Sequence, residues 1–347
     1  MGDQAGEAAA GERVTLLDVA RHAGVSRATA SLVLRHSPLV AADTRERVRS
    51  SMRQLGYVYH RAAASLRTQR THSVGLVIPD LANPFFAELT VGIEATLDQA
   101  NYVVMLANTA ESPAKQDRLL ATLYENNADG VLFCPAVGTP PAAVDALIRR
   151  RLPVVLLVRY LPAIDLEYVG TDNVLGAEMA TEHLIEHGHR RLAFIGGSPT
   201  SSARCDRVQG FHNALARHGL PAHEALMPNS PPTRRGGYEA IRSLPMGEDA
   251  PTAALCYNDV VAFGVLLGLQ HDGYHPGRDF AVIGFDDISE ASLWYPALTT
   301  VAVSPRRIGE AAAHLLLTRI GHAGGPPRQV ILSPTLVVRA SCGPHSE

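Results

Sequence analysis

The sequence contains little lysine, few cysteines and no long apolar run. A single lysine, Lys115, stands among thirty arginines in a chain of 347 residues, which we attribute to the composition of the genome rather than to function. No apolar run reaches about 18 residues, so no transmembrane helix is predicted. The cysteines are far apart and form no CxxC or metal-binding spacing, which argues for a reducing compartment; they are Cys134, Cys205, Cys256 and Cys342.

The first dozen residues lack the features of a secretory signal, which needs a basic start and an apolar core. They are small and acidic, with the sequence MGDQAGEAAAGE. We therefore expect residues 1–12 to form a disordered tail on a cytoplasmic protein.

The motifs of common enzyme classes are absent as well. The sequence has no nucleophile elbow, P-loop or dinucleotide fingerprint, and the glycine-rich stretch at 196–199 lacks the G-x-G-x-x-G spacing. His183, His187 and His189 have a spacing that could hold a metal, but no carboxylate or cysteine arrangement completes the set. The sequence therefore predicts no enzyme, no cofactor and no metal site.

Positive charge is concentrated near the amino terminus. Residues 13–70 contain eleven arginines against Asp18, Asp43 and Glu46, a net charge of +8. Because the whole chain carries −3, the other residues carry −11. A basic end on an acidic body is the charge distribution expected of a nucleic-acid-binding protein.

Residues 14–57 have the pattern of a helix-turn-helix unit closed by a third helix. Thr15 with Asp18 three residues later is a helix-start signature. Gly24 follows the first helix, where a left-handed residue is wanted, and Ser26 can cap the second helix. In such units the second helix enters the major groove. A generic three-helix bundle with a charged outer face is the alternative.

The first residues of the second helix are the candidates for reading DNA bases. Arg27 can bond bidentately to guanine, whereas Ala28 can offer only apolar contact, for instance to a thymine methyl. Phosphate contacts, which set the register on DNA, suit the hydroxyl-bearing residues: Thr15, Thr29, Ser31, Thr44 and Tyr57.

The motifs VTLLDVARHAGVS, TASLVL, TRERV and LGY resemble the headpiece of the LacI/GalR (lactose-repressor) family of bacterial transcription regulators. The resemblance extends from Val14 to about Arg339. It implies that Arg27 and Ala28 choose the operator sequence, while Leu32 departs from an arginine often found at a third base-reading position. The full set of predicted DNA contacts is Thr15, Leu16, Ser26, Arg27, Ala28, Thr29, Ser31, Leu32, Arg35, Thr44, Tyr57, His60, Ala64 and Leu66.

A linker at residues 60–71 follows the predicted headpiece at 13–59. Residues 60–68 are alanine-rich and helix-permissive, but too short to be stable alone. The family resemblance implies a hinge helix that folds in the minor groove, with Leu66 wedged between base pairs. An ordinary flexible linker is the alternative.

From His72 onward, short apolar runs alternate with amphipathic stretches, which predicts parallel sheets covered by helices. HSVGLVIPD and RRLAFIGGSP are weak echoes of each other, which indicates two similar lobes. The predicted fold is an all-α headpiece followed by an α/β body of the two-lobed periplasmic-binding-protein type. The first lobe is predicted at 72–171 and 301–328, and the second at 172–300 and 329–342.

Ligands of such sheets lie beyond the carboxyl ends of the strands, so the residues that follow the strands are candidate ligand contacts. The resemblance gives the D-x-x-N-P-F-F string and Arg207 this role. Several alternatives stay open: the phenylalanines as core residues, Asp172 as a helix cap, and Arg207 in a salt bridge between lobes. The predicted effector contacts are Asn83, Phe85, Phe86, Asp172, Arg207, Asn258 and Asp286.

This mixture of arginine, carboxylates, amides and aromatic rings suits a neutral polyol or a sugar. Val303 and Pro305 stand where some family members have polar or aromatic ligand contacts, so the identity of the ligand is open. Asp259 is expected to cap a helix. Asp286 and Asp287 adjoin on one loop and would point apart, which argues against paired acid–base chemistry.

The sequence thus predicts a nucleoid-associated regulator that represses sugar-utilisation genes. We expect a homodimer on a pseudo-palindromic operator, because the symmetry of the protein dictates that of the DNA. A small sugar-like effector between the lobes would control DNA binding through the hinge. The alternative is a sugar-binding protein of a transport system, which the basic headpiece and the missing signal disfavour.

Overall fold

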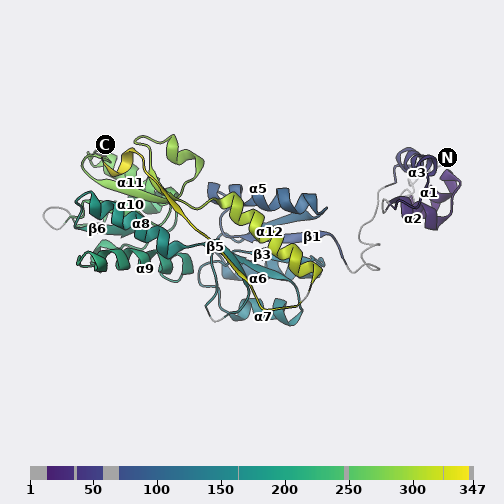
Figure 1. Cartoon of the computed structure of the whole chain (residues 1–347), viewed down its shortest axis with the longest axis horizontal. Helices are drawn as coiled ribbons and strands as arrows, with labels where there is room; N and C mark the ends of the chain where they lie inside the picture. Colours follow the sequence, from purple (N-terminus) through teal and green to yellow (C-terminus); the bar gives the residue numbers. More distant parts are fainter. Residues whose placement is uncertain are drawn as a thin grey trace, which may run out of the picture. The chain divides into compact units, whose positions relative to one another are not determined.

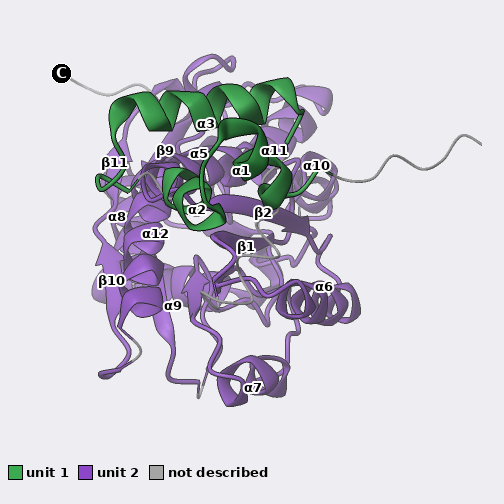
Figure 2. Cartoon of the chain, turned by 90° about the vertical axis from the view of Figure 1, so that its right-hand side faces the viewer, with its two compact units in different colours: residues 1–69 green, residues 70–347 purple. Residues whose placement is uncertain are grey.

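The computed structural model describes residues 14–34, 37–57, 70–162, 164–245, 250–322 and 324–343. The chain divides into two units, residues 1–69 and residues 70–347 (Figure 2). Several sequence predictions lie outside the described residues: the tail at 1–12, Arg35, and the part of the hinge that contains His60, Ala64 and Leu66.

Three helices form the described part of the first unit: α1 (Leu16–Ala23), α2 (Arg27–Leu34) and α3 (Ala42–Gln54). A capping box starts α1, since the Asp18 amide donates to the Thr15 hydroxyl and the Thr15 amide donates to the Asp18 carboxylate. Gly24 ends α1 with a φ of 64°, which glycine adopts without strain. The Thr29 amide donates to the Ser26 hydroxyl at 3.1 Å, and this bond caps α2. The predicted helix starts and glycine turn are confirmed.

The core of this unit is made of small residues. Because valine and alanine side chains fill little space, the three helices pack closely and their outer faces stay exposed. Leu34, the last residue of α2, is half-buried. The buried residues are Val19, Ala20, Ala23, Ala30, Val33, Val40 and Val48.

The second unit contains two sheets, one in each lobe (Figure 1). The first-lobe sheet is fully parallel, in the order β10-β5-β4-β3-β1-β2. Its strands are β1 (Ser73–Ile78), β2 (Val103–Asn108), β3 (Gly130–Phe133), β4 (Val154–Leu157), β5 (Glu167–Thr171) and β10 (Gln329–Leu332).

The second-lobe sheet has the order β11-β9-β8-β7-β6, and only the β11–β9 pairing is antiparallel. Its strands are β6 (Leu192–Ile195), β7 (Ala253–Cys256), β8 (Ala281–Asp286), β9 (Thr299–Ala302) and β11 (Thr335–Val337). Both sheets therefore confirm the predicted parallel α/β architecture.

Helices cover both sheets, and none of those described combines the length and apolar composition needed to cross a bilayer. The first lobe carries α5 (Pro84–Gln99), α6 (Pro113–Glu125), α7 (Ala142–Arg149) and α12 (Pro305–Gly321). The second lobe carries α8 (Asn173–Glu186), α9 (Ser202–Arg217), α10 (Arg234–Arg242), α11 (Asp259–His271) and the short 3-10 helices η1 (Glu224–Leu226), η2 (Ser289–Ser292) and η3 (Ala340–Cys342).

Strand β1 shows how the first-lobe sheet is buried on both faces. Leu76 and Ile78 belong to the core cluster that contains Leu89 and Ile93 of α5, whereas Val77 belongs to the cluster with Leu120 of α6. Successive side chains of a strand point to opposite faces, so one apolar run serves two layers of helices. This explains why the strand has an unbroken apolar sequence.

The chain passes between the lobes three times, and the predicted lobe boundaries need correction at two of these crossings. Strand β10, assigned to the second lobe from the sequence, pairs with β5 and belongs to the first lobe. Strand β9, placed partly in the first lobe, pairs with β8 in the second. Strands β10 and β11 are separated only by Ser333 and Pro334, so this short stretch supplies one edge strand to each lobe.

Helices α5 and α12 pack with their backbones in close approach (Figure 1). A Cβ atom on Gly92 would lie 2.1 Å from the carbonyl oxygen of Arg306, and one on Gly309 would lie 2.3 Å from that of Leu89. Glycine at both positions therefore sets the distance between these helices. No separate helix was predicted for residues 305–321, although α12 is a main element of the first lobe.

We expect Gly92→Ala to destabilise the first lobe by about 1–3 kcal/mol, because the added methyl group must push α12 away from α5. The matched control is Gly321→Ala at the end of α12, where a Cβ meets no atom within 4 Å. Urea unfolding followed by circular dichroism measures both variants. Equal midpoints for the two variants would contradict the close approach.

Candidate nucleic-acid interface and ligand cleft

The first turn of α2 presents an exposed polar surface. Ser26, Arg27 and Ala28 are exposed, and Thr29 is half-buried. Within the described residues, Arg27 forms no hydrogen bond or ion pair, so its guanidinium is free to bind an acceptor outside the chain. The Ser26 and Thr29 hydroxyls lie 2.9 Å apart.

The other predicted DNA contacts divide by burial. Thr15 is exposed at the start of α1, whereas Ser31 and Thr44 are half-buried. Three others pack partly against the small core of the unit, which gives them a structural role besides any contact with DNA: Leu16, Leu32 and Tyr57.

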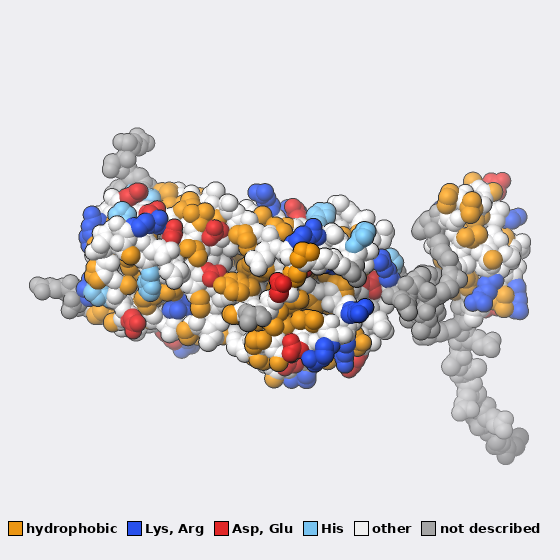
Figure 3. Space-filling view, turned by 60° about the horizontal axis from the view of Figure 1, so that its bottom comes forward, with side chains coloured by type: hydrophobic (Ala, Val, Ile, Leu, Met, Phe, Trp, Pro, Cys, Tyr) orange, Lys and Arg blue, Asp and Glu red, His pale blue; other side chains and the backbone are white. Residues whose placement is uncertain are grey.

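Some basic side chains of the first unit form hydrogen bonds or ion pairs within the chain, and others are exposed. Figure 3 shows several of them close together on one side of this unit. Arg53 is paired with Glu46 at 2.7 Å, and Arg45 donates to the carbonyl of Val40 at 2.9 Å. Arg27 and Arg47 are exposed. These free guanidinium groups are suited to phosphates or base edges.

A narrow cleft lies between the two lobes, at the carboxyl ends of strands β1, β4, β7 and β8. It contains six of the seven predicted effector contacts. Its lining residues are Asp80, Asn83, Phe85, Phe86, Glu111, Val158, Arg159, Arg207, Pro232, Tyr257, Asn258 and Asp286.

Arg207, on α9, is the most heavily bonded side chain of the second-lobe wall. Its Nε donates to Asn173 Oδ1 at 2.8 Å, and one terminal nitrogen donates to the carbonyl of Tyr257. The other lies 3.7 Å from Asp286 Oδ1. The guanidinium also stacks on Phe285, 3.6 Å from the ring centre. All of these partners belong to the second lobe, so the alternative of a salt bridge between lobes is wrong.

Asp286 reaches the cleft from a backbone conformation that is costly for a residue with a side chain. Its φ is 124° and that of Asp287 is 55°, and such positions cost about 1–3 kcal/mol each. Burial raises the pKa of the Asp286 carboxyl well above its usual value, against the opposing influence of Arg207. The strain and the shifted pKa identify the end of β8 as a specialised part of the cleft.

Asp259 fixes the backbone beyond this strained turn. Its carboxylate accepts hydrogen bonds from the Ile288 amide at 2.9 Å and from the Thr300 hydroxyl. The expectation that Asp259 caps α11 is wrong, because Asn258 caps that helix through the Val261 amide. Burial raises the pKa of Asp259 to about 6.

Asn83 and Asn258 both cap helices at the cleft. The Asn83 Oδ1 atom accepts from the Phe85 amide at 3.0 Å, and the Asn258 Oδ1 atom accepts from Val261 at 2.9 Å. Each side-chain amide therefore keeps its NH₂ group for other partners. Phe85 and Phe86 pack edge to face, 5.2 Å apart, and both line the cleft and belong to the core.

The first-lobe wall contains an ion pair that sequence reasoning missed, in which Arg159 is buried and Glu111 is half-buried. Arg159, after β4, contacts Glu111 Oε1 at 2.9 Å and Oε2 at 3.1 Å, and donates to the carbonyl of Pro135. The Arg159 Nε atom is buried without a hydrogen bond in the described chain. Its position directly after the apolar run at 153–158 was the signal that could have identified it.

Asp172 does not line the cleft. It caps α8 by accepting from the Leu175 amide at 2.9 Å, and it borders a separate cavity. The alternative of a helix cap is therefore confirmed, and the contact of Asp172 with an effector stays a prediction.

The free space inside the cleft is about 30 Å³, room for little more than water. Small-molecule sites are usually about 300–1,000 Å³. Because arginines and carboxylates of the walls fill the gap, a ligand must displace them or separate the lobes. Guanidinium, carboxylate, amide and aromatic groups together can bind the hydroxyls and the apolar face of a polyol.

The three histidines with metal-like spacing have separate partners. His189 contacts the Thr252 hydroxyl at 2.9 Å, His187 contacts the carbonyl of His183, and His183 lies 3.4 Å from the thiol of Cys342. Across the described ranges, no three histidine, cysteine or acidic side chains are arranged to hold a metal ion.

Comparisons with known proteins match both parts of the chain. The model for bacterial regulatory proteins of the lacI family matches residues 15–59, and that for a periplasmic binding protein-like domain matches residues 181–342. The HTH-type transcriptional regulator DegA of Bacillus subtilis is 30% identical over 96% of this chain and 99% of its own. The ribose operon repressor of Haemophilus influenzae is 31% identical over 94% of this chain and 98% of its own.

A solved structure also resembles the chain over almost its whole length. The complex of the transcriptional regulator CelR with cellobiose has a TM-score of 0.73 and 32% identity, covering 95% of this chain and all of that one. The similarity therefore includes both the helical unit and the two-lobed body.

The buried carboxyl of Asp259 predicts a pH-dependent stability. Because its pKa is raised to about 6, the folded body holds this proton more tightly than the unfolded chain. Its stabilising contribution is complete below about pH 4 and is lost as the pH rises through about 6. Relative to Asp259→Asn, which does not titrate, the wild type should lose about 2–3 kcal/mol over this range.

The single tryptophan, Trp294, reports on this region because it stacks on Phe263 of α11 at 4.4 Å. Its fluorescence during urea unfolding between pH 4 and pH 7 measures both proteins. If the difference in unfolding free energy between the wild type and Asp259→Asn is constant from pH 4 to pH 7, the raised pKa of Asp259 is contradicted.

Proposed function

Because the chain belongs to the lacI family of bacterial regulatory proteins and is a DNA-binding transcriptional regulator, we propose that it represses genes of sugar utilisation. In this proposal, a small sugar-like effector binds in the cleft and alters the affinity of residues 13–59 for an operator. The coexistence of a free arginine at the first turn of α2 and a hydroxyl-binding cleft in one chain carries the proposal.

Base reading is assigned to the first turn of α2. Arg27 is exposed and unpaired within the described residues, and a guanidinium can bond to the O6 and N7 atoms of guanine. Ala28 beside it is also exposed, and its methyl group can contact only apolar groups of a base, such as a thymine methyl. Thr15, Thr29, Ser31, Thr44 and Tyr57 keep their proposed role as phosphate contacts.

A sugar is the proposed effector class because the wall groups match its chemistry. Arg207 and Asp286 offer donors and acceptors for adjacent hydroxyls, Asn83 and Asn258 offer amide NH₂ groups, and Phe85 and Phe86 offer apolar faces. Two similar proteins support the same class, since one is a ribose operon repressor and the other is a regulator in complex with cellobiose.

Effector and operator are linked through the arrangement of the lobes. The nearly filled cleft must change when a sugar enters, and the three crossings allow the lobes to move against each other. In a homodimer on a pseudo-palindromic operator, this movement would shift the paired hinge segments at 60–71, with Leu66 in the minor groove. A coupling of about 1–3 kcal/mol is typical of such linked sites.

The alternative of a sugar-binding protein for a transporter explains only the body. It leaves the lacI-family match at residues 15–59 without a role. We therefore favour a cytoplasmic, nucleoid-associated regulator, in which the cleft binds its ligand without chemical change.

Arg27→Ala should relax the choice of base pair at one position in each operator half-site. We expect a loss of about 1–3 kcal/mol on the selected operator, because one bidentate base contact disappears. The control is Arg47→Ala, which removes the same charge from the exposed surface of α3. Selection of binding sites from random duplex DNA, repeated for each protein, measures the preference. An unchanged preference in Arg27→Ala would refute the assignment.

Arg207→Ala should abolish the response to sugar while leaving operator binding within about threefold of the wild type, because the side chain lies in the cleft, whereas operator binding is assigned to residues 13–59. Operator affinity is measured with and without members of a sugar panel that includes ribose and cellobiose. Arg207→Lys keeps the charge but loses the planar fork, so it should retain at most a weak response.

The matched control for these variants is Arg235→Ala on the exposed face of α10, where the side chain pairs only with its neighbour Glu239 at 2.7 Å. It should respond like the wild type. A normal response of Arg207→Ala at unchanged sugar concentration would place the effector elsewhere.

A further inference from the structure

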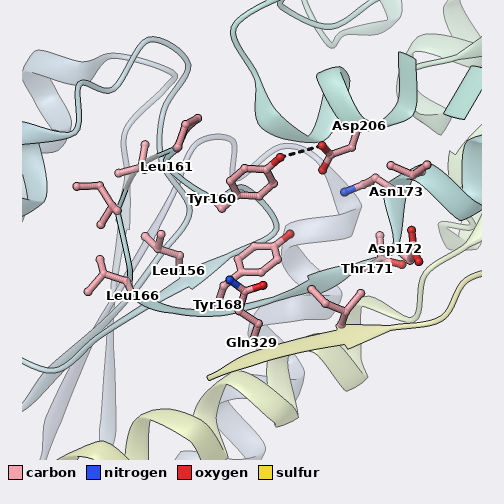
Figure 4. Close-up of a pocket in the computed structure, with 14 residues that line it drawn as sticks. Leu156, Tyr160, Leu161, Leu166, Tyr168, Thr171, Asp172, Asn173, Asp206 and Gln329 are labelled. Atoms are coloured by element: carbon pink, nitrogen blue, oxygen red, sulfur yellow. Dashed lines mark hydrogen bonds between the residues drawn. The ribbon is translucent and has the colours of Figure 1, made fainter. Parts of the chain in front are cut away.

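A second and larger cavity lies beside the connection between the lobes (Figure 4). Its volume is about 510 Å³, within the range of about 300–1,000 Å³ that small-molecule sites occupy. The two cavities share no lining residue, since Arg207 borders the cleft and its neighbour Asp206 borders this one. We call it the hinge cavity.

Both lobes build the walls of the hinge cavity. From the first lobe, Tyr160 follows β4 and Tyr168 lies on β5; from the second, Asn173 begins α8 and Asp206 lies on α9. The Tyr160 hydroxyl donates to Asp206 Oδ1 at 2.8 Å, and the Tyr160 amide donates to Ser202 Oγ at 3.0 Å. A ligand in this cavity would thus contact groups that join the two lobes.

The charged side chains among the described lining residues are both acidic. They are Asp172 and Asp206, and each has carboxylate capacity beyond its one hydrogen bond, to Leu175 and Tyr160 respectively. Burial raises the pKa of Asp206, and the nearby Asp172 adds to this effect, whereas Tyr160 and Arg207 oppose it. A bound cation would relieve this unfavourable burial of negative charge.

Asn173 supplies a hydrogen-bond donor with no partner in the described chain. The side chain is 3% exposed, and its Oδ1 accepts from Arg207 Nε. Figure 4 shows its nitrogen directed into the cavity, toward Tyr160 and Asp206. An NH₂ group that faces the cavity and has no partner in the described chain can donate to an acceptor oxygen of a ligand.

The remaining surface is aromatic and aliphatic. The rings of Tyr160 and Tyr168 stand edge to face, with centres 5.7 Å apart, and Leu156 and Leu166 lie beside them. Tyr168 lies over Gly170: a Cβ atom added to Gly170 would be 2.1 Å from the hydroxyl oxygen of Tyr168. Tyrosine faces attract ammonium groups as well as apolar surface.

We propose that the hinge cavity binds a small amino alcohol: an ammonium group between the Asp172 and Asp206 carboxylates, a hydroxyl at the Asn173 amide, and an apolar body on the tyrosines. A neutral sugar leaves the two carboxylates without a cation, and an anion is repelled by them. Because both lobes contribute contacts, occupancy stabilises the arrangement of lobes seen here.

The test uses three probes that share a phenyl group and a neighbouring hydroxyl but differ in charge. These are 2-amino-1-phenylethanol (cationic), 1-phenylethane-1,2-diol (neutral) and mandelate (anionic). Isothermal titration calorimetry on the full chain should show single-site binding of the amine, with the diol about tenfold weaker and mandelate not measurable. Equal binding of all three probes, or no binding of the amine at millimolar concentration, overturns the proposal.

Two conservative variants locate the site. Asp206→Asn keeps an acceptor for Tyr160, and Asp172→Asn keeps a cap for α8, so both should fold as the wild type does. Each should weaken binding of the amine by about tenfold, whereas Asp98→Asn, the same change on the exposed surface of α5, should have no effect. If both Asp206→Asn and Asp172→Asn bind the amine as tightly as the wild type, the proposal is also overturned. The measurement uses neither DNA nor a sugar effector, so its outcome is independent of the proposed regulatory function.

Discussion

The two-lobed body depends on how its three crossings are tied together. At the carboxyl ends of β5 and β10, the Thr171 hydroxyl and the Asp172 amide both donate to the carbonyl of Leu332, each at 3.0 Å. Two crossing segments therefore move as one. Asp172 then caps α8, so the same short stretch ends a first-lobe strand and starts a second-lobe helix. Any change in the angle between the lobes must bend the chain near this point.

The cleft is compatible with such movement because its charges are balanced within each lobe. Arg159 pairs with Glu111 in the first lobe, and Arg207 contacts Asp286 in the second. Breaking a buried pair by removing one partner costs about 3–5 kcal/mol, and lobe separation that keeps both pairs intact avoids that cost. Once the lobes separate, a sugar meets side chains that are already oriented, which lowers the cost of ordering them on binding.

The sequence predicted correctly those helices and strands that have local signals. The predictions failed where the result depended on which strands or side chains pair in the folded chain. Thr15, Gly24 and Ser26 fix the helix-turn-helix through their own hydrogen bonds and φ angles, and the apolar runs identified most strands. The lobe of β10 could not be inferred, because its partner β5 lies about 160 residues earlier and only the sheet brings them together. Arg159 was missed for a related reason, since an arginine after a strand is ordinarily exposed and only Glu111 and Pro135 explain its burial.

Asp172 shows how a residue that caps a helix can also border a cavity. As a helix cap it is fully explained by the Leu175 amide, yet capping uses only one of its lone pairs. The residue also borders the hinge cavity, next to the segment that links the lobes. A ligand there would contact the crossing point itself, whereas a ligand in the cleft contacts residues beyond the carboxyl ends of other strands, β1, β4, β7 and β8. The body thus has two places where binding energy can alter one angle, and linkage requires each to influence the other.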